Sequence, residues 1–179
     1  MSIRFLLLAL CGLLLGTGAA HCGELKPWNG GATPSLSLED PAGKTHDLAA
    51  YRGKVVLVNF WATWCAPCRE ELPSMQALRE RLAGKPFEVL AVNLMESEEK
   101  IAAFRESELI DLPVLMDRDG AAAKRWRVRM LPISFVVDRQ GAIRYQLVGE
   151  ANWTGPDVAP VIERLIGADA KNQSASAAR

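Results

Sequence analysis

The feature that most constrains the fold is an apolar run that leads directly into a pair of cysteines. Val55–Trp61 reads Val-Val-Leu-Val-Asn-Phe-Trp, and Cys65-Ala-Pro-Cys68 follows within four residues. The run is too short for a helix and too apolar for a half-exposed strand, so it predicts a strand buried on both faces. Apolar residues then recur every three or four positions, which predicts a helix over 66–82. A buried strand that turns directly into a helix indicates a sheet covered by helices.

Predicted strands and helices also follow one another along the rest of the chain. Further strands are expected at 35–39, 45–48, 87–94, 112–116, 133–137 and 143–148, and further helices at 97–108, 119–126 and 154–167. Thr154 is expected to cap the last helix with Asp157 as its reciprocal partner, and Pro73 is expected to kink the helix over 66–82. Crossovers followed by a hairpin predict one α/β sandwich around a mixed sheet.

The first residues have the pattern of a targeting segment. Arg4 precedes an apolar stretch of about 15 residues, and small residues end at Ala20, where we expect a signal peptidase to cut. The stretch is short for a membrane span, but an uncleaved anchor remains an alternative. Residues 21–32 are interpreted as a lead-in, 33–167 as the folded domain, and 168–179 as a disordered tail.

Composition excludes several classes of function. Lys plus Arg and Asp plus Glu are both 21, so no basic excess is available for a nucleic acid. The chain has two histidines, His21 and His46, which are too few for a multi-histidine metal site, and no metal is expected. Cleavage after Ala20 would remove Cys11 and leave Cys22 as an odd thiol. We interpret it as an unpaired thiol on a disordered end of the chain, with intermolecular pairing as the alternative.

The spacing of Cys65 and Cys68 favours redox chemistry. A cysteine at the start of a helix meets unpaired amide donors and the positive end of the helix dipole, which stabilise its thiolate. Cys65 is therefore expected to be the exposed nucleophile, and Cys68, one turn later, to resolve the mixed disulfide. No cofactor beyond this redox-active pair is expected. Two alternatives are weaker. The cysteine pair could be half of a zinc site, but His21 and Cys22 would then have to fold back onto it to complete the four ligands. The pair could also be a purely structural disulfide, but it closes too small a loop to add much stability.

Residues 60–68, followed by Glu-Glu-Leu-Pro at 70–73, resemble the thioredoxin superfamily. The similarity spans about 33–167 and is greatest to the TlpA/ResA-like extracytoplasmic thiol–disulfide oxidoreductases, which include the cytochrome c maturation thioredoxins. It implies a thioredoxin-like three-layer sandwich with an N-terminal hairpin and an extra strand–helix insertion between 93 and 116. It also implies a cis bond before Pro132 and a substrate-binding rim. The residues of that rim would be Trp64, Ala66, Pro67, Leu131 and Pro132.

Two further residues distinguish the ResA-like branch from thioredoxin itself. Asn59 stands where thioredoxin has a buried acid, and an asparagine cannot take up a proton. Glu71 matches an active-site glutamate of the ResA-like proteins, so the resemblance implies a catalytic role in thiol acid–base chemistry. The alternative is a solvated helix carboxylate, which is how we interpret the neighbouring Glu70.

The resulting expectation is a periplasmic reductase of protein disulfides. Ala66-Pro67 is typical of the reducing branch, whereas strong oxidants often carry histidine before the second cysteine. The resemblance implies oxidised proteins as clients, apocytochrome c among them, and a membrane thiol-electron donor; we expect a monomer. The alternatives are an oxidant or isomerase, a peroxiredoxin-type peroxidase and a copper-delivery protein. The last typically uses a Cys-X-X-X-Cys motif and a distant histidine, and no histidine follows His46.

Overall fold

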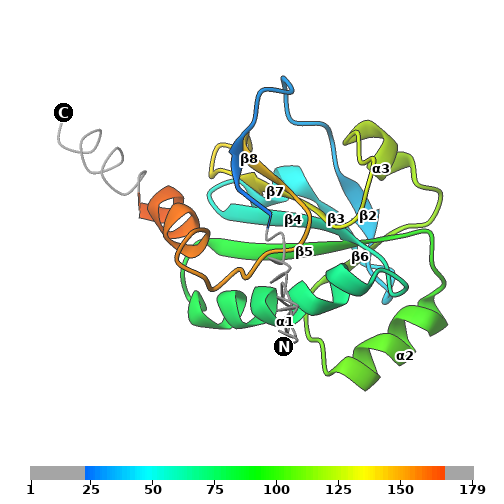
Figure 1. Cartoon of the computed structure of the whole chain (residues 1–179). Coiled ribbons are helices and arrows are strands. Elements are labelled where there is room, and N and C mark those ends of the chain that lie inside the picture. Colours follow the sequence, from blue (N-terminus) through cyan, green and yellow to red (C-terminus); the bar gives the residue numbers. More distant parts are fainter. Residues whose placement is uncertain (1–22, 168–179) are drawn as a thin grey trace, which may run out of the picture.

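A computed structural model describes residues 23–167, and a six-stranded mixed sheet forms their centre (Figure 1). The strand order is β1-β8-β7-β4-β5-β6. The six strands are β1 (Lys26–Pro27), β4 (Val55–Trp61), β5 (Phe87–Leu94), β6 (Val114–Asp117), β7 (Ile133–Val137) and β8 (Ile143–Val148). β5 pairs in parallel with β4 and β6, whereas β7 runs antiparallel to β4 and β8. The expectation of a mixed sheet is confirmed.

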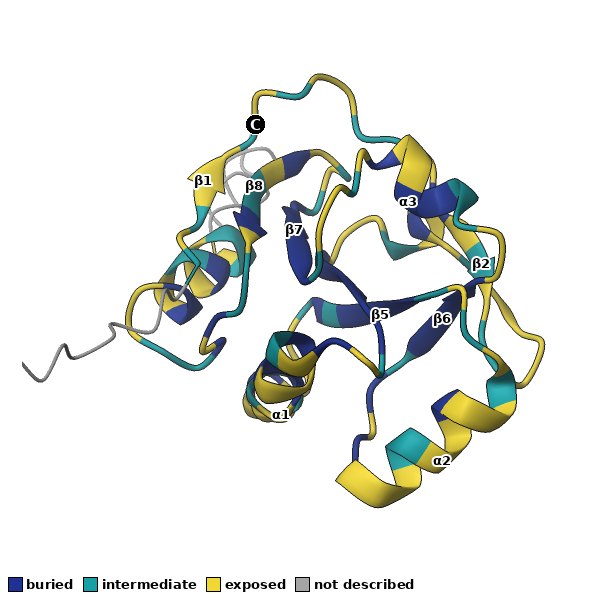
Figure 2. Cartoon of the chain, turned by 45° about the vertical axis from the view of Figure 1, so that its right-hand side comes forward, coloured by how far each residue is buried: buried dark blue, intermediate teal, exposed yellow. Residues whose placement is uncertain are grey.

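Helices and a small hairpin cover the two faces of this sheet (Figures 1 and 2). One face carries α1 (Ala66–Arg81) and α2 (Glu98–Glu108). The other carries α3 (Ala121–Arg125) and the two-stranded hairpin of β2 (Ser37–Glu39) and β3 (Thr45–Asp47), which the short 3-10 helix Leu48–Tyr51 follows. Each face has its own hydrophobic cluster, so the expected three-layer sandwich with an N-terminal hairpin is confirmed.

β4 lies in the middle of the sheet and contributes side chains to the hydrophobic clusters on both of its faces. All seven of its residues are buried. Val55, Leu57 and Trp61 pack into the cluster beneath α1, and the alternate residues Val56, Val58 and Phe60 pack into the cluster beneath α3. This two-residue alternation follows from strand geometry. The continuous apolar run therefore fixes both the position of the strand and the direction in which the following turn leaves the sheet.

One edge strand lies in a segment that the sequence pattern assigned to the lead-in. Lys26 and Pro27 form β1 and pair with Gln146 and Tyr145 of β8. The lead-in predicted over 21–32 is therefore not separate from the folded domain, because these two of its residues belong to the sheet. Two residues are too few for a strand periodicity, and a proline normally argues against a strand; it is tolerated here because β1 is an edge strand.

The C-terminal helix begins later than its sequence predicts. Its residues are 159–167, and the Thr154 hydroxyl donates to Asn152 Oδ1 at 2.7 Å instead of capping the helix. Asn152 Oδ1 also accepts from the Thr154 amide at 3.1 Å, so the local turn takes the groups that the predicted cap required.

α1 continues through Pro73. The predictions of a signal peptide at 1–20 and of a tail at 168–179 lie outside the described residues. Within 23–167, no helix is both long and apolar enough to cross a membrane.

Candidate active site

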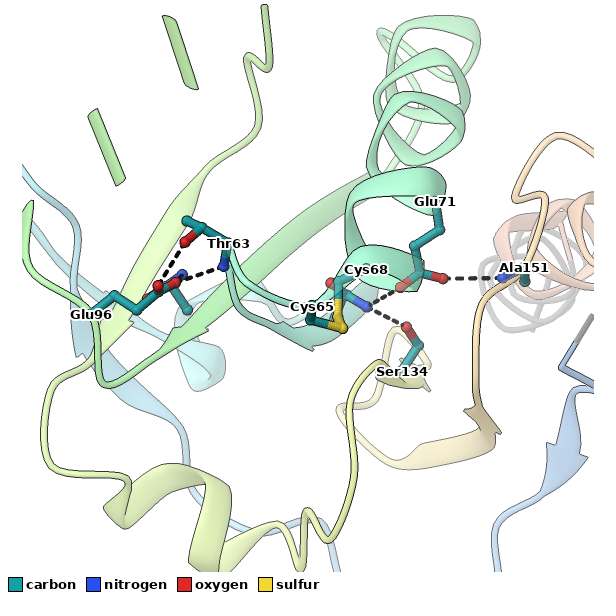
Figure 3. Close-up of a disulfide and its surroundings, with 9 residues drawn as sticks. Thr63, Cys65, Cys68, Glu71, Glu96, Ser134 and Ala151 are labelled. Atoms are coloured by element: carbon teal, nitrogen blue, oxygen red, sulfur yellow. Dashed lines mark hydrogen bonds between the residues drawn. A yellow bond between two sulfur atoms is a disulfide. The ribbon is translucent and has the colours of Figure 1, made fainter. Parts of the chain in front are cut away.

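The start of α1 places two cysteines in a disulfide (Figure 3). Cys65 is the N-cap residue of α1 and Cys68 occupies its third position, with Cα atoms 5.3 Å apart. Pro67, between them, has no amide proton. In the disulfide form the Cys65 side chain makes no capping hydrogen bond. After reduction, a residue at this N-cap position would have the amide of the third helical residue, Cys68, as the donor nearest to its side chain. This geometry stabilises negative charge on the Cys65 sulfur.

The two cysteines differ in their access to solvent. Cys65 is 6% exposed, whereas Cys68 is completely buried. The expectation of an exposed Cys65 is wrong for the disulfide form, because the disulfide turns its sulfur toward the apolar cluster beneath α1. Its neighbours Trp64 and Ala66 are exposed, with Trp64 at 66%. Of the two cysteines, Cys65 is therefore the more exposed residue, and its neighbours on either side in the chain are open to solvent.

The loop before β7 lies at the same end of the sheet as the disulfide. The Leu131–Pro132 bond is cis, as the sequence predicts. Ile133 pairs with Phe60 near the end of β4, so this bond lies beside the turn that leads to Cys65. Pro132 is buried, and its carbonyl accepts from the Gly149 amide at 3.0 Å. The structure thus brings the Leu131–Pro132 loop to the rim that also contains Trp64.

Glu71 is a buried carboxyl group one turn after Cys68. It is 2% exposed, and its Oε1 accepts from Asn59 Nδ2 at 2.8 Å. Its Oε2 accepts from the Trp153 indole at 3.0 Å and from the Ala151 amide at 3.2 Å. Burial raises the pKa of Glu71 to about 8, although these three hydrogen bonds oppose the rise. The alternative of a solvated carboxylate is wrong for Glu71, whereas Glu70 is exposed, as expected.

Asn59 connects this carboxyl group to the cis-proline loop. Its Nδ2 donates both to Glu71 and to the Ser134 hydroxyl, the latter at 2.9 Å (Figure 3). Its Oδ1 is buried and has no hydrogen-bond partner among residues 23–167. Sequence reasoning missed Ser134, Ala151 and Trp153, because no local pattern connects them with a glutamate that is 63 to 82 residues away along the chain. The buried tryptophan was visible only as one more apolar residue.

A second buried carboxylate holds the turn that precedes Cys65. Glu96 accepts from both the amide and the hydroxyl of Thr63, each at 2.7 Å, and from Asn93 Nδ2 at 2.9 Å (Figure 3). Its side chain is 4% exposed and also pairs with Lys100. Burial alone would raise the pKa of Glu96, but hydrogen bonds from Lys100, Thr63 and Asn93 outweigh it and lower the pKa. Sequence reasoning missed this residue as well, since a glutamate after a strand has no special signature.

The described part of the chain offers little to a metal ion. Between residues 23 and 167, no group of three or more His, Cys, Asp or Glu side chains could hold one. His46 instead bonds Asp40 through Nε2 at 2.9 Å and Tyr51 through Nδ1 at 2.7 Å. The alternative zinc ligands His21 and Cys22 lie outside the described residues.

Comparison with known proteins agrees with this site. Residues 30–146 match the AhpC/TSA family. The chain is 35% identical over 120 residues to the thiol–disulfide oxidoreductase ResA of Geobacillus thermodenitrificans, covering 67% of this chain and 69% of the relative. It is 37% identical over 123 residues to the thioredoxin-like protein YneN of Bacillus subtilis, covering 67% and 71%. A thiol:disulfide interchange protein of the thioredoxin family from Chlorobium tepidum superposes with a TM-score of 0.64 at 27% identity, covering 79% of this chain and 97% of that one. The chain therefore belongs to the AhpC/TSA family and is a thiol–disulfide oxidoreductase of the ResA-like kind.

Proposed function

We propose that this enzyme is a reductase of protein disulfides that works in the periplasm. The observation that supports reduction of the substrate, rather than its oxidation, is the buried Glu71 one turn beyond Cys68. When it is ionised, a carboxylate one turn after Cys68 disfavours a second negative charge nearby, so it raises the thiol pKa values and opposes the thiolate stabilisation that the helix N-terminus gives to Cys65. Ala66 and Pro67 supply no positive charge between the cysteines to reverse this effect.

The site supports a two-step exchange. The Cys65 thiolate attacks one sulfur of the substrate disulfide; that S–S bond breaks, and the leaving substrate thiolate takes a proton from solvent. Cys68 then gives its proton to the ionised Glu71 carboxylate and attacks the Cys65 sulfur, and the second substrate thiolate leaves. That thiolate takes up a proton from solvent, and Glu71 returns its proton to solvent and is restored as the carboxylate. Two electrons and two protons leave the Cys65–Cys68 dithiol in total, and the enzyme ends as the disulfide. No bound cofactor takes part.

The proposed partners follow from this direction and from the N-terminal pattern. Residues 1–20 would direct export and then be removed, or stay as an anchor. A reductase in an oxidising compartment must be reduced again, which calls for a membrane thiol-electron donor. The clients would be oxidised protein thiols, apocytochrome c among them, recognised by a monomer through Trp64, Ala66, Pro67 and the Leu131–Pro132 loop. The exposed Trp64 and the cis-proline loop beside the disulfide support this choice of rim.

A stoichiometric reduction assay tests the proposal. Reduced protein is mixed with an oxidised peptide that carries Cys-X-X-Cys-His, and peptide thiols are counted by mass spectrometry after alkylation. We expect nearly one peptide disulfide reduced for each protein oxidised, and none with Cys65→Ser. The opposite outcome, in which the reduced protein stays reduced while its oxidised form converts the dithiol peptide to the disulfide, would assign the enzyme to the oxidants.

A further inference from the structure

A cluster of positive charge lies on the segment between α3 and the cis-proline bond. Four side chains of this segment are cationic and exposed: Lys124, Arg125, Arg127 and Arg129. Within residues 23–167, none of them forms an ion pair with an acidic side chain. Trp126, between them, is buried at 1% exposure and donates from its indole to the Ser35 carbonyl at 3.2 Å. The segment is thus anchored to the fold through its tryptophan while its charges face solvent unneutralised.

This basic segment, 124–129, leads toward the reactive disulfide. It leads through Met130 directly into the cis Leu131–Pro132 bond, and Figure 3 shows the chain from α3 passing alongside the disulfide to reach Ser134. Met130 is 58% exposed and Trp64 is 66% exposed. A protein that brings a cysteine to Cys65 must therefore lie over an apolar rim with the basic segment at its border.

The opposite border of the site is acidic. Glu70 and Glu150 line a pocket of about 440 Å³ that also reaches Glu71 and Ala151. Figure 3 places Ala151 and the chain that leaves α3 on different sides of the disulfide. The proximity of Glu70 contributes to a raised pKa of Glu150, after the larger effect of burial. The charges around the disulfide are therefore unequal, and a partner with a matching asymmetry would bind in one orientation.

The backbone of Arg127 gives the basic segment a defined conformation. Arg127 has a φ of 55°, in the left-handed region. Its amide donates to the Lys124 carbonyl at 3.1 Å, and the Val128 amide donates to the Ala123 carbonyl at 2.9 Å. This pair of bonds is a Schellman motif, in which the residue at the position of Arg127 is usually glycine. The motif ends α3 at a fixed point and holds the start of the loop that leads to Met130 in one backbone conformation.

We infer that the basic segment is a docking surface for an acidic stretch of the partner protein, adjacent to the cysteine that reacts with Cys65. The inference rests on the proposed function only in taking a protein disulfide as the partner. Opposite charges at the edge of an interface act chiefly on the rate of encounter and on orientation. The preference should therefore appear in kcat/KM, and it should fade with salt.

The test compares three peptide disulfides with the same Cys-X-X-Cys core, flanked by aspartates, serines or lysines. Exchange with the reduced enzyme is followed by tryptophan fluorescence. At low salt we expect kcat/KM to be about 10-fold higher for the aspartate peptide than for the lysine peptide, and the ratio to fall toward 1 in 0.5 M NaCl. Equal rates for the three peptides would overturn the inference and leave the proposed function standing. A lack of exchange with every peptide would instead overturn the proposed function.

Variants separate docking from folding. Arg127→Gly should lower kcat/KM for the aspartate peptide about 3-fold, leave the serine peptide unchanged, and raise the midpoint of thermal unfolding by about 2–4 °C. Leu109→Gly is the matched control, since Leu109 also has a left-handed φ of 54° but follows α2. It should raise the midpoint similarly and change neither rate. Equal effects of the two variants on the aspartate peptide would contradict the inference. Salt-dependent binding to phosphatidylglycerol vesicles without any peptide preference would assign the segment to a membrane surface and also overturn it.

Discussion

Replacing Cys68 by serine is expected to stop the reaction halfway, with the substrate bound covalently to Cys65. Cys65 is the more accessible cysteine, at 6% exposure against none for Cys68, and it is the N-cap residue of α1. Attack by Cys65 therefore does not depend on Cys68, but release of the product does. Turnover should fall at least about 10³-fold in Cys68→Ser, while the first step remains fast.

Mass spectrometry of the reaction mixture checks this prediction. Cys68→Ser should gain the mass of one peptide within seconds, whereas Cys65→Ser should gain none. Both variants should remain folded, because a disulfide with a sequence separation of 3 removes little entropy from the unfolded chain. If Cys65→Ser trapped the peptide through Cys68, the assignment of nucleophile and resolving cysteine would have to be exchanged.

The second large effect is expected from Glu71→Gln. The pKa of Glu71 is raised to about 8, mainly by burial, so only about a tenth of the molecules carry the carboxylate at pH 7. If that carboxylate accepts the Cys68 proton, the rate of mixed-disulfide resolution rises with pH until about pH 8 and then levels off. Glu71→Gln has no base to offer and should resolve the mixed disulfide about 10²-fold more slowly below pH 8.

Rapid-quench measurement of product release between pH 5 and 10 gives this profile. The wild-type plateau near pH 8 should be absent from Glu71→Gln, whose rate should continue to rise as the Cys68 thiol itself ionises. Glu70→Gln, one residue away and exposed, is the matched control and should keep the wild-type profile. Identical profiles for wild type and Glu71→Gln would remove Glu71 from the mechanism.

The same substitution has a stability signature with a defined sign. A carboxyl group with a pKa of about 8 in the folded oxidised protein and about 4.5 in the unfolded chain holds its proton more tightly when folded. Its contribution to the free energy of unfolding is therefore fully present below about pH 4.5 and is lost as the pH rises to 8. Relative to Glu71→Gln, the wild type should lose roughly 3–5 kcal/mol across that range.

The elements around Cys65 were predictable because they depend on local patterns. A continuous apolar run specifies β4, three- and four-residue spacing specifies α1, and the position of the cysteines between them specifies the redox pair. These patterns are dictated by the packing of one element against its neighbours. They required no knowledge of which distant segment supplies each contact.

The surroundings of Glu71 and Thr63 could not be predicted in this way. Spacing places Glu71 on α1 but does not show that the Trp153 indole donates to it from 82 residues away. Likewise, Glu96 reaches Thr63 only because β5 lies parallel to β4 and both strands end at the same edge of the sheet. Residues 26–27 form a strand only because β8 provides an edge. Each of these features belongs to the tertiary fold.

The reduction potential of the Cys65–Cys68 pair tests the central claim most directly. It can be measured by tryptophan fluorescence in buffers of defined dithiothreitol and glutathione ratio, because Trp64 adjoins Cys65 in the chain. A disulfide reductase requires a value below about −220 mV, toward that of thioredoxin. A value above about −150 mV, toward the strong oxidants, would contradict the proposed direction and identify the enzyme as one that forms or isomerises disulfides.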